Sequence, residues 1–554
     1  MTVPADAVDQ DPGTGGQQHA GEDNVLRFPQ RTPPPPPPLS MAALRADHES
    51  RRAAVVEGRP EAVARQRSLG KLTARERLAL LLDPDSFTEL DLHRRAAAGG
   101  AMTSRSAGAY TDGVVAGSGT VDGRRVFVYA QDFTVMGGSL GRTHAAKIHK
   151  VMDLALATGC PVIALNDSGG ARIQEGVLAL HGCGEIFRRQ VAASGIVPQI
   201  SVVLGPCAGA AAYSPALADV VFMVRDVAQM YLTGPDVVQT VTGERVSHEE
   251  LGGAGVHGPR SGVATIVVDD ERECLDRVRH LLSLLPSNNL DPAPSGPPCG
   301  AADDVRPRLA DLVPADARRP YDVRDVIAEL LDDEEPVEFH REWAGNVVCV
   351  LGRIDGRVVG VVGNQPLVLA GVLDRHASQK AARFVRFCDT FGIPLVTLVD
   401  VPGFLPGRDQ EEAGIIRHGA QLLYAYCEAT VPRVQVVLRK AYGGAYIVMD
   451  SRSIGTDLSF AWPTNEIAVM GPEAAVNVLH RRALAGAPDP AALRARLASE
   501  YRDEYLDPRY AAEHGLVDDV IDPADTRVAI ARGLQLLCSK RTERRPRKHG
   551  NIPL

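Results

Sequence analysis

The chain is poor in aromatic residues and lacks the features of several common protein classes. Aromatic residues make up 5% of its 554 residues, and its nine cysteines include no C-x-x-C pair. Such scattered cysteines predict reduced thiols, with neither a disulfide framework nor a zinc ribbon. No hydrophobic run is long enough to span a bilayer, and the N-terminus has no apolar signal core. We therefore expect a cytoplasmic protein without membrane contact.

Charge and motif content exclude further functions. The net charge is −9 with a pI near 6.0, which argues against a general nucleic-acid binder. There is no G-x-x-x-x-G-K-S/T loop, so nucleotide hydrolysis is not supported. The histidines show no metal-ligand spacing, and we predict no metal site; they include His144, His149, His181, His418 and His480.

What the chain does have is an internal repeat. The segment CPVIALNDSGGARIQEG is matched by IPLVTLVDVPGFLPGRDQE, and IVPQISVVLGPCAGAAAYSP is matched by TVPRVQVVLRKAYGGAYIVM. Matched anchors lie 233, 234 and 237 residues apart, in the pairs Asp167 and Asp400, Pro198 and Pro432, and Gly234 and Gly471. Three matches in register indicate a duplicated unit, which typically builds two similar halves with a site between them.

Each half carries a turn of small residues directly after a strand that reads as buried. The turns are Gly209-Ala210-Ala211 and Gly443-Gly444-Ala445. Small residues let backbone N–H groups come close to a ligand oxygen. We therefore expect two facing turns that bind oxyanions.

Composition divides the chain into segments. Residues 1–40 are rich in Gly, Gln, Asp and Pro and predict a disordered tail with a short polyproline rod. Residues 41–290 and 315–554 contain the two repeats and predict two domains, and the Pro-rich segment 291–314 between them predicts a linker.

Within each half, short apolar runs alternate with stretches of helical spacing. Strand-like runs include VFVYAQD, PVIALND and ISVVLGP in the first half, and VVGVVGNQP, LVTLVD and VQVVLRK in the second. Helical stretches end at Gly159 and Gly392, and Thr73 with Glu76 forms a capping-box pattern ahead of another helix. Strands separated by helices predict parallel βαβ units and an α/β fold.

The motifs resemble those of the carboxyltransferase β subunits of biotin-dependent acyl-CoA carboxylases of the propionyl-CoA carboxylase type. The resemblance runs from about residue 70 to 554. The motifs that carry it are GKLTARERLALLLDPDSFTELD, GGSLG, NDSGGARIQEG, GPCAGAAAYSP, PSNN, NQP with ASQKAARF, LVDVPGFLPG, GIIRHGA, RKAYGGAY, AWP, IAVMGPE and RKHGNIPL.

The resemblance implies two tandem crotonase-like domains of the ClpP/crotonase superfamily, assembled as a homohexamer. It also implies transfer of a carboxyl group from carboxybiotin to the α-carbon of a short-chain acyl-CoA, such as propionyl-CoA or acetyl-CoA, or one with a longer chain. No methionine precedes a lysine, so the chain has no Met-Lys-Met biotinylation site. The resemblance therefore implies a partner α subunit that carries biotin and biotin carboxylase activity, with biotin and coenzyme A as the only cofactors and no metal.

The resemblance also implies site residues. The acyl-CoA oxyanion site falls on Gly209 and Ala210, and the biotin site on Gly444 and Ala445. Ile447 follows the second turn and is expected to influence the choice of acyl chain. Further residues expected to contact acyl-CoA or biotin are Gly137, Gly138, Gly169, Gly170 and Arg172.

The chain departs from the family pattern in two places. Ala210 stands where the family usually has a second glycine, and the added methyl group can narrow the cleft. The segment RTHAAKIHK after GGSLG replaces a more acidic, aromatic one. Two other functions fit the same motifs: the carboxyltransferase subunit of a sodium-pumping decarboxylase, and a non-catalytic scaffold for the biotin-carrying subunit. A crotonase-type hydratase is disfavoured because no paired-Glu site is apparent.

Overall fold

The computed structural model describes residues 40–96, 110–333, 335–543 and 546–553. The predicted N-terminal tail lies outside the described residues except for Ser40. Residues 1–53 and 54–554 form separate units. In the first unit, the described residues are exposed and make up most of helix α1 (Met41–Glu57).

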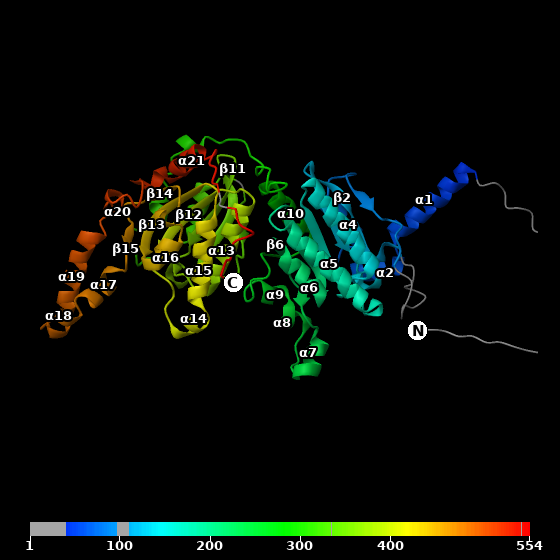
Figure 1. Cartoon of the computed structure of the whole chain (residues 1–554), viewed down its shortest axis with the longest axis horizontal. Coiled ribbons are helices and arrows are strands. Elements are labelled where there is room, and N and C mark those ends of the chain that lie inside the picture. The colour runs from blue at the N-terminus through cyan, green and yellow to red at the C-terminus, as the bar shows by residue number, and fades with distance from the viewer. Residues whose placement is uncertain (1–39, 97–109, 334, 544–545, 554) are drawn as a thin grey trace, which may run out of the picture. The chain divides into compact units, whose positions relative to one another are not determined.

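The first repeat folds into a sheet of eight described strands, in the order β1-β2-β3-β4-β5-β6-β8, with β7 paired to β5. Strands β2 and β6 of this sheet are labelled in Figure 1. Strands β3 to β8 pair in parallel, as the alternation of strands and helices predicted. Strands β1 to β3 pair antiparallel, which the sequence analysis did not predict. The strands are β1 (Thr88–Leu90), β2 (Val114–Val121), β3 (Arg124–Gln131), β4 (Val162–Ser168), β5 (Gln199–Ala208), β6 (Val220–Val224), β7 (Gln229–Tyr231) and β8 (Ile266–Val268).

The second repeat builds a sheet of the same design, in the order β16-β14-β13-β12-β11-β10-β9, with β15 paired to β13. Here too, three antiparallel strands, β9 to β11, precede the parallel ones. The strands are β9 (Val337–Phe339), β10 (Val347–Ile354), β11 (Arg357–Asn364), β12 (Leu395–Val401), β13 (Arg433–Tyr442), β14 (Leu458–Ala461), β15 (Glu466–Ala468) and β16 (Asp519–Val520).

Helices connect and cover the strands of both sheets (Figure 1). Those of the first half are α2 (Pro60–Ser68), α3 (Ala74–Leu81), α4 (Arg142–Thr158), α5 (Val177–Ala193), α6 (Ala210–Leu217), α7 (Pro235–Thr242), α8 (His248–Gly252), α9 (Ala254–His257) and α10 (Glu271–Leu284). Those that follow are α11 (Leu309–Leu312), α12 (Val323–Leu330), α13 (Arg375–Thr390), α14 (Arg408–Glu412), α15 (Ile415–Glu428), α16 (Gly443–Val448), α17 (Pro472–Leu479), α18 (Arg481–Gly486), α19 (Pro490–Tyr505), α20 (Tyr510–Glu513) and α21 (Thr526–Leu536).

Local sequence signals set the helix ends that were predicted. The Thr73 hydroxyl accepts from the Glu76 N–H at the start of α3, and the Glu76 carboxylate accepts from the Thr73 N–H, which is a complete capping box. Gly159 ends α4 in the left-handed conformation, with φ at 63°. Gly392, with φ at 66°, stands just beyond the end of α13. The predicted capping box and both glycine ends are therefore confirmed.

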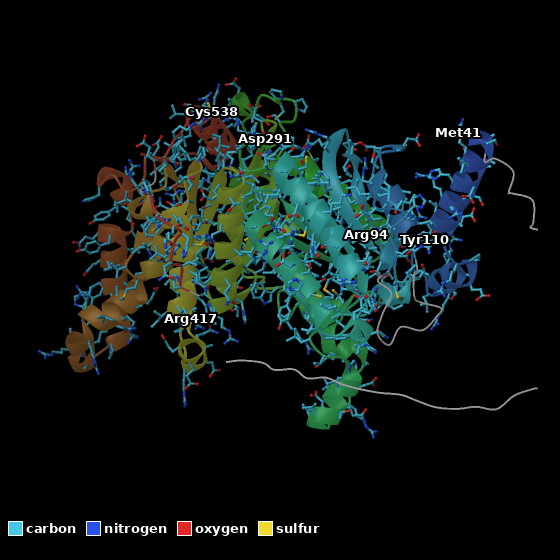
Figure 2. The ribbon with its side chains drawn as sticks, turned by 45° about the vertical axis from the view of Figure 1, so that its right-hand side comes forward. Met41, Arg94, Tyr110, Asp291, Arg417 and Cys538 are labelled. Atoms are coloured by element: carbon cyan, nitrogen blue, oxygen red, sulfur yellow. The ribbon has the colours of Figure 1, made fainter. Side chains whose placement is uncertain are left out.

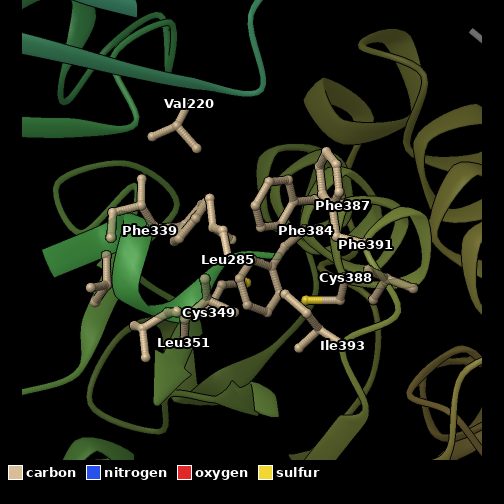
Figure 3. Close-up of a cluster of buried hydrophobic side chains, with 14 of the residues drawn as sticks. Val220, Leu285, Phe339, Cys349, Leu351, Phe384, Phe387, Cys388, Phe391 and Ile393 are labelled. Atoms are coloured by element: carbon tan, nitrogen blue, oxygen red, sulfur yellow. The ribbon is translucent and has the colours of Figure 1, made fainter. Parts of the chain in front are cut away.

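Successive side chains of a strand point to opposite faces of its sheet, so the buried side chains form separate hydrophobic clusters. Ile163 of β4 faces the cluster that contains α3 and α10, whereas its neighbour Val162 faces α4 and α5. The cluster on the α3 side continues into the second half, where it includes side chains of β9, β10 and α13. Figure 3 shows Val220 and Leu285 of the first half beside Phe339 and Phe384 of the second. The two halves thus share this cluster, whereas a second cluster belongs to the first half alone and a third to the second half alone.

Three further findings concern the sequence predictions. Within the predicted linker, Ala301 and Leu309 are buried in the core of the second half, so this segment packs along part of its length. All nine cysteines are free thiols, and Cys538 is among the exposed ones (Figure 2). In the residues that the structure describes, no helix is both long and apolar enough to cross a bilayer, and no group of His, Cys, Asp or Glu side chains is arranged to hold a metal ion.

Candidate active site

The first small-residue turn joins β5 to α6. Gly209 has φ at 61° and ψ at −128°, a conformation that favours glycine, and the helix begins at Ala210. The Gly209 N–H donates to the carbonyl oxygen of Tyr231 on β7, at 3.0 Å. The next N–H groups, of Ala210 and Ala211, are at the start of α6, where a helix has no carbonyl of its own to receive them. These two are the donors that the first turn can offer to a ligand.

The second turn joins β13 to α16 and has the same geometry. Gly443 has φ at 59°, and a Cβ there would lie 3.0 Å from the carbonyl oxygen of Val469, just after β15. A Cβ on Gly209 would face the carbonyl oxygen of Leu232, just after β7. Gly443 is therefore the structural equivalent of Gly209.

This equivalence fixes the register of the two turns. The predicted pairs, Gly209 with Ala210 and Gly444 with Ala445, are shifted by one residue relative to each other. The first-half equivalents of Gly444 and Ala445 are Ala210 and Ala211. Ala210 packs against the core cluster under α4 and α5, and a Cβ placed on Gly444 would have no heavy atom within 4 Å. The second turn is therefore more open than the first.

The predicted glycine loops lie against each other beside the first turn. The Gly169 N–H donates to the Gly137 carbonyl at 2.9 Å, and the Ser168 hydroxyl donates to the Gly138 carbonyl at 2.7 Å. A Cβ on Gly170 would lie 2.6 Å from the carbonyl oxygen of Ala208, the residue before Gly209. The structure thus brings all four predicted glycines together at the end of β5.

Arg172 has a buried side chain that is already occupied. Its guanidinium pairs with Asp112 at 2.5 Å and Glu175 at 2.8 Å, and it donates to the hydroxyl and the carbonyl of Ser139. Only 2% of the residue is exposed. These contacts join the two glycine loops to the start of α5, so the observed role of Arg172 is to hold them. Contact of Arg172 with acyl-CoA or biotin stays a prediction.

The residues at matching positions after the two turns are both exposed. Ile447 on α16 is 42% exposed, and Tyr213, at the matching position on α6, is 52% exposed. Tyr446 packs against the cluster that the two halves share. The Tyr213 ring instead rests edge-on against Phe187 near the surface.

Titratable side chains next to the turns are held neutral. Burial raises the pKa of the Cys207 thiol, two residues before Gly209, to about 12. Burial, together with its hydrogen bond to Glu466, strongly raises the pKa of Tyr442, directly before Gly443. Neither group is an activated nucleophile or base near neutral pH, so the turns offer backbone dipoles rather than acid–base chemistry.

The second half contains a loop that the sequence patterns did not predict. Leu369, Ala370 and Gly371 all have positive φ, as do Met136, Gly137 and Gly138 in the first half. Ala370 stands where the first-half loop has Gly137, so the two loops do not look alike in the sequence. The signal that could have revealed it is the matching offset from the end of the preceding strand.

The comparisons with known proteins agree with this geometry. The carboxyl transferase domain family matches residues 65–552. The propionyl-CoA carboxylase β chain of Saccharopolyspora erythraea is 55% identical over 524 residues, covering 92% of this chain and 95% of the relative. The methylmalonyl-CoA decarboxylase subunit α of Veillonella parvula is 50% identical over 512 residues, covering 92% of this chain and 98% of the relative.

A solved structure extends the match to three dimensions. The transcarboxylase 12S, with methylmalonyl-CoA and methylmalonic acid bound, has a TM-score of 0.91 and 48% identity, covering 93% of this chain and 99% of its own. The predicted fold of two crotonase-like α/β domains is confirmed. The predicted enzyme class, acyl-CoA carboxyl transfer, is confirmed as well. The chain therefore belongs to the carboxyl transferase family and is a carboxyltransferase β subunit of the acyl-CoA carboxylase type.

Proposed function

We propose that this chain moves a carboxyl group between carboxybiotin, held on a partner α subunit, and the α-carbon of a short-chain acyl-CoA, with propionyl-CoA as the first candidate. The observation that carries the proposal is the pair of equivalent turns at Gly209 and Gly443, one in each half. Two reacting carbonyl groups, one on each substrate, require two such sets of donors. We further propose that the enzyme works in the cytoplasm.

At the first turn, the N–H groups of Ala210 and Ala211 would receive the thioester oxygen as negative charge develops on it. At the second turn, the N–H groups of Gly444 and Ala445 would receive the ureido oxygen of biotin. The open space at Gly444, with no heavy atom within 4 Å of a Cβ there, fits a ligand placed directly on the backbone. Bound carboxybiotin supplies both the carbon dioxide and the base, so no side chain has to remove the α-proton.

A second copy of the chain would complete each site. Apolar side chains flank both turns at matched positions and are well exposed, which is typical of surfaces that are covered in an assembly; they are Tyr213 (52%), Leu232 (57%), Ile447 (42%) and Val469 (75%). We propose that the first half of one subunit faces the second half of another, within a homohexamer. The transcarboxylase 12S is described as a hexamer. Sedimentation that finds a stable, fully active monomer would contradict this arrangement.

The test of the activity uses the chain alone. Incubation with methylmalonyl-CoA and free biotin should release propionyl-CoA in a biotin-dependent reaction, since carboxyl transfer is reversible. A scaffold without catalytic activity would produce none above the rate without enzyme.

The likeness to a methylmalonyl-CoA decarboxylase subunit supports a second candidate, the carboxyltransferase subunit of a sodium-pumping decarboxylase. The same assay would be positive for both candidates. Purification from cells separates them, because a biotinylated, ATP-using partner supports the carboxylase and a membrane-protein partner supports the pump.

A further inference from the structure

Each half buries one carboxylate at the same place in its sheet. Asp167 stands near the end of β4 and Asp400 near the end of β12, and both are 0% exposed. In both strands, the register with the next strand shifts at this residue, between Asn166 and Ser168 and between Val399 and Val401. Such an irregularity redirects the chain, here into the glycine loop beside the turn.

The backbone of each aspartate supports a glycine loop. A Cβ on Gly138 would lie 2.2 Å from the carbonyl oxygen of Asp167, and a Cβ on Gly371 would lie 2.7 Å from that of Asp400. The loops therefore rest directly on the two aspartates. A shift of either aspartate would move the loop that borders its turn.

The cations that hold the two aspartates come from different parts of the chain. Asp167 pairs with Lys71 at 2.7 Å and with Arg77 at 2.9 Å, both from the segment that precedes the first sheet. Asp400 instead pairs with Arg439 at 2.9 Å, from the neighbouring strand β13. The Arg439 guanidinium also donates to the backbone carbonyls of Pro314, Asp316 and Arg319.

The repeat explains this difference. The first-half equivalent of Arg439 is Gly205, six residues into β5 as Arg439 is into β13. A Cβ on Gly205 would lie 2.0 Å from the Asp167 carboxylate and 2.5 Å from the Lys71 ammonium. Strand β5 thus has no cationic side chain at the position of Arg439. The Lys71 side chain instead occupies the space beside Gly205.

We propose that Lys71 and Arg439 are positioning residues, each of which sets the geometry of the turn in its own half through the buried aspartate. The inference rests on the proposed function, in which the first turn serves acyl-CoA and the second serves biotin. Each cation then governs the affinity for one substrate and leaves the other unchanged.

The test compares Lys71→Met with Arg439→Lys in the full assembly, in biotin-dependent decarboxylation of methylmalonyl-CoA. In the first variant, Asp167 still accepts hydrogen bonds from Arg77, which it shares with Glu271, and from the Gln66 amide, so the fold should survive. The ratio of KM for methylmalonyl-CoA to KM for biotin should change about ten-fold in opposite directions in the two variants, since misplacement by about 1 Å costs up to about 10²-fold. Lys71→Arg should restore the ratio. A general structural defect would lower kcat and leave this ratio unchanged.

Hydrogen exchange gives a readout that does not need activity. Amides of residues 166–172 should exchange faster in Lys71→Met, and those of residues 399–405 faster in Arg439→Lys. An unchanged KM ratio, or exchange that rises equally in both segments, would overturn the inference. If the wild-type enzyme is inactive, the proposed function fails, and exchange still decides whether each cation acts on its own half.

Discussion

Gly444→Val separates catalysis from folding at the second turn. Gly444 has no positive φ and no heavy atom within 4 Å of a Cβ built on it, so a β-carbon is accepted there without backbone strain or close contact. Glycine and valine differ by less than about 1 kcal/mol in helix propensity. The free energy of unfolding should therefore change by less than about 1 kcal/mol.

The effect on catalysis should be far larger. The valine side chain would occupy the open space in front of the N–H groups of Gly444 and Ala445, and so keep the ligand oxygen away from them. Removal of one oxyanion donor typically costs about 10²–10³ in kcat, or about 2.7–4 kcal/mol of transition-state stabilisation. We expect a loss of at least this size, with Tm nearly unchanged.

The assay is carboxyl transfer from methylmalonyl-CoA to free biotin, with Tm measured on the same samples. Gly486→Val is the matched control, because Gly486 also has open surroundings and no positive φ but lies on α18, outside both turns. It should retain near-normal kcat. Gly209 is a poorer test position, because its φ of 61° would strain any replacement. Near-normal kcat in Gly444→Val would refute the assignment of oxyanion donors to this turn.

Two further predictions concern specificity and pH. We expect Ile447 to contact the acyl tail, and such an apolar contact is worth about 0.8 kcal/mol per buried methylene. Ile447→Asp should narrow the range of acetyl-, propionyl- and butyryl-CoA toward propionyl-CoA, because a longer chain would bury the new carboxylate without a partner. Equal kcat/KM ratios for the three thioesters in both proteins would exclude this role. Burial lowers the pKa of His144 to about 3, so both the folded and the unfolded chain hold a neutral imidazole above about pH 6.5. Below that pH the unfolded chain binds a proton that the folded chain does not, and the free energy of unfolding falls by about 2 kcal/mol at pH 5. His144→Asn should flatten the loss of stability between pH 6.5 and 5 in chemical unfolding. An unchanged slope would show that the folded and unfolded states take up the same number of protons at this residue, so that its pKa is not lowered in the folded chain.

Sequence patterns predicted the structure correctly where one local signal determines it. The run VFVYAQD became β3 because β-branched and aromatic residues suit a buried strand. The end of α4 at Gly159 followed because glycine adopts the left-handed conformation without a penalty. The repeat also predicted that the two halves would have the same fold, since equal spacing of strands and turns leaves little choice of topology.

The register of the turns could not be predicted in the same way. The runs AGAAAY and AYGGAY each offer several small residues, and local sequence does not say which one bends the chain. The hydrogen bond from the Gly209 N–H to the Tyr231 carbonyl decides it, because that group is then lost to a ligand. This bond joins strands that are separated by a helix, so it becomes visible only in the folded chain.

The repeat also concealed where the two halves diverge. An alignment of β5 with β13 sets Gly205 against Arg439 and suggests that the first half has lost a buried cation. The structure shows instead that Lys71, from before the first sheet, enters the space that Gly205 leaves. A buried carboxylate without a cation is strongly destabilising, so Asp167 and the segment around Lys71 and Arg77 depend on each other. The GKLTARER motif thus belongs to the core of the first half, and a fragment that begins at Thr88 would leave Asp167 buried without its counter-ions.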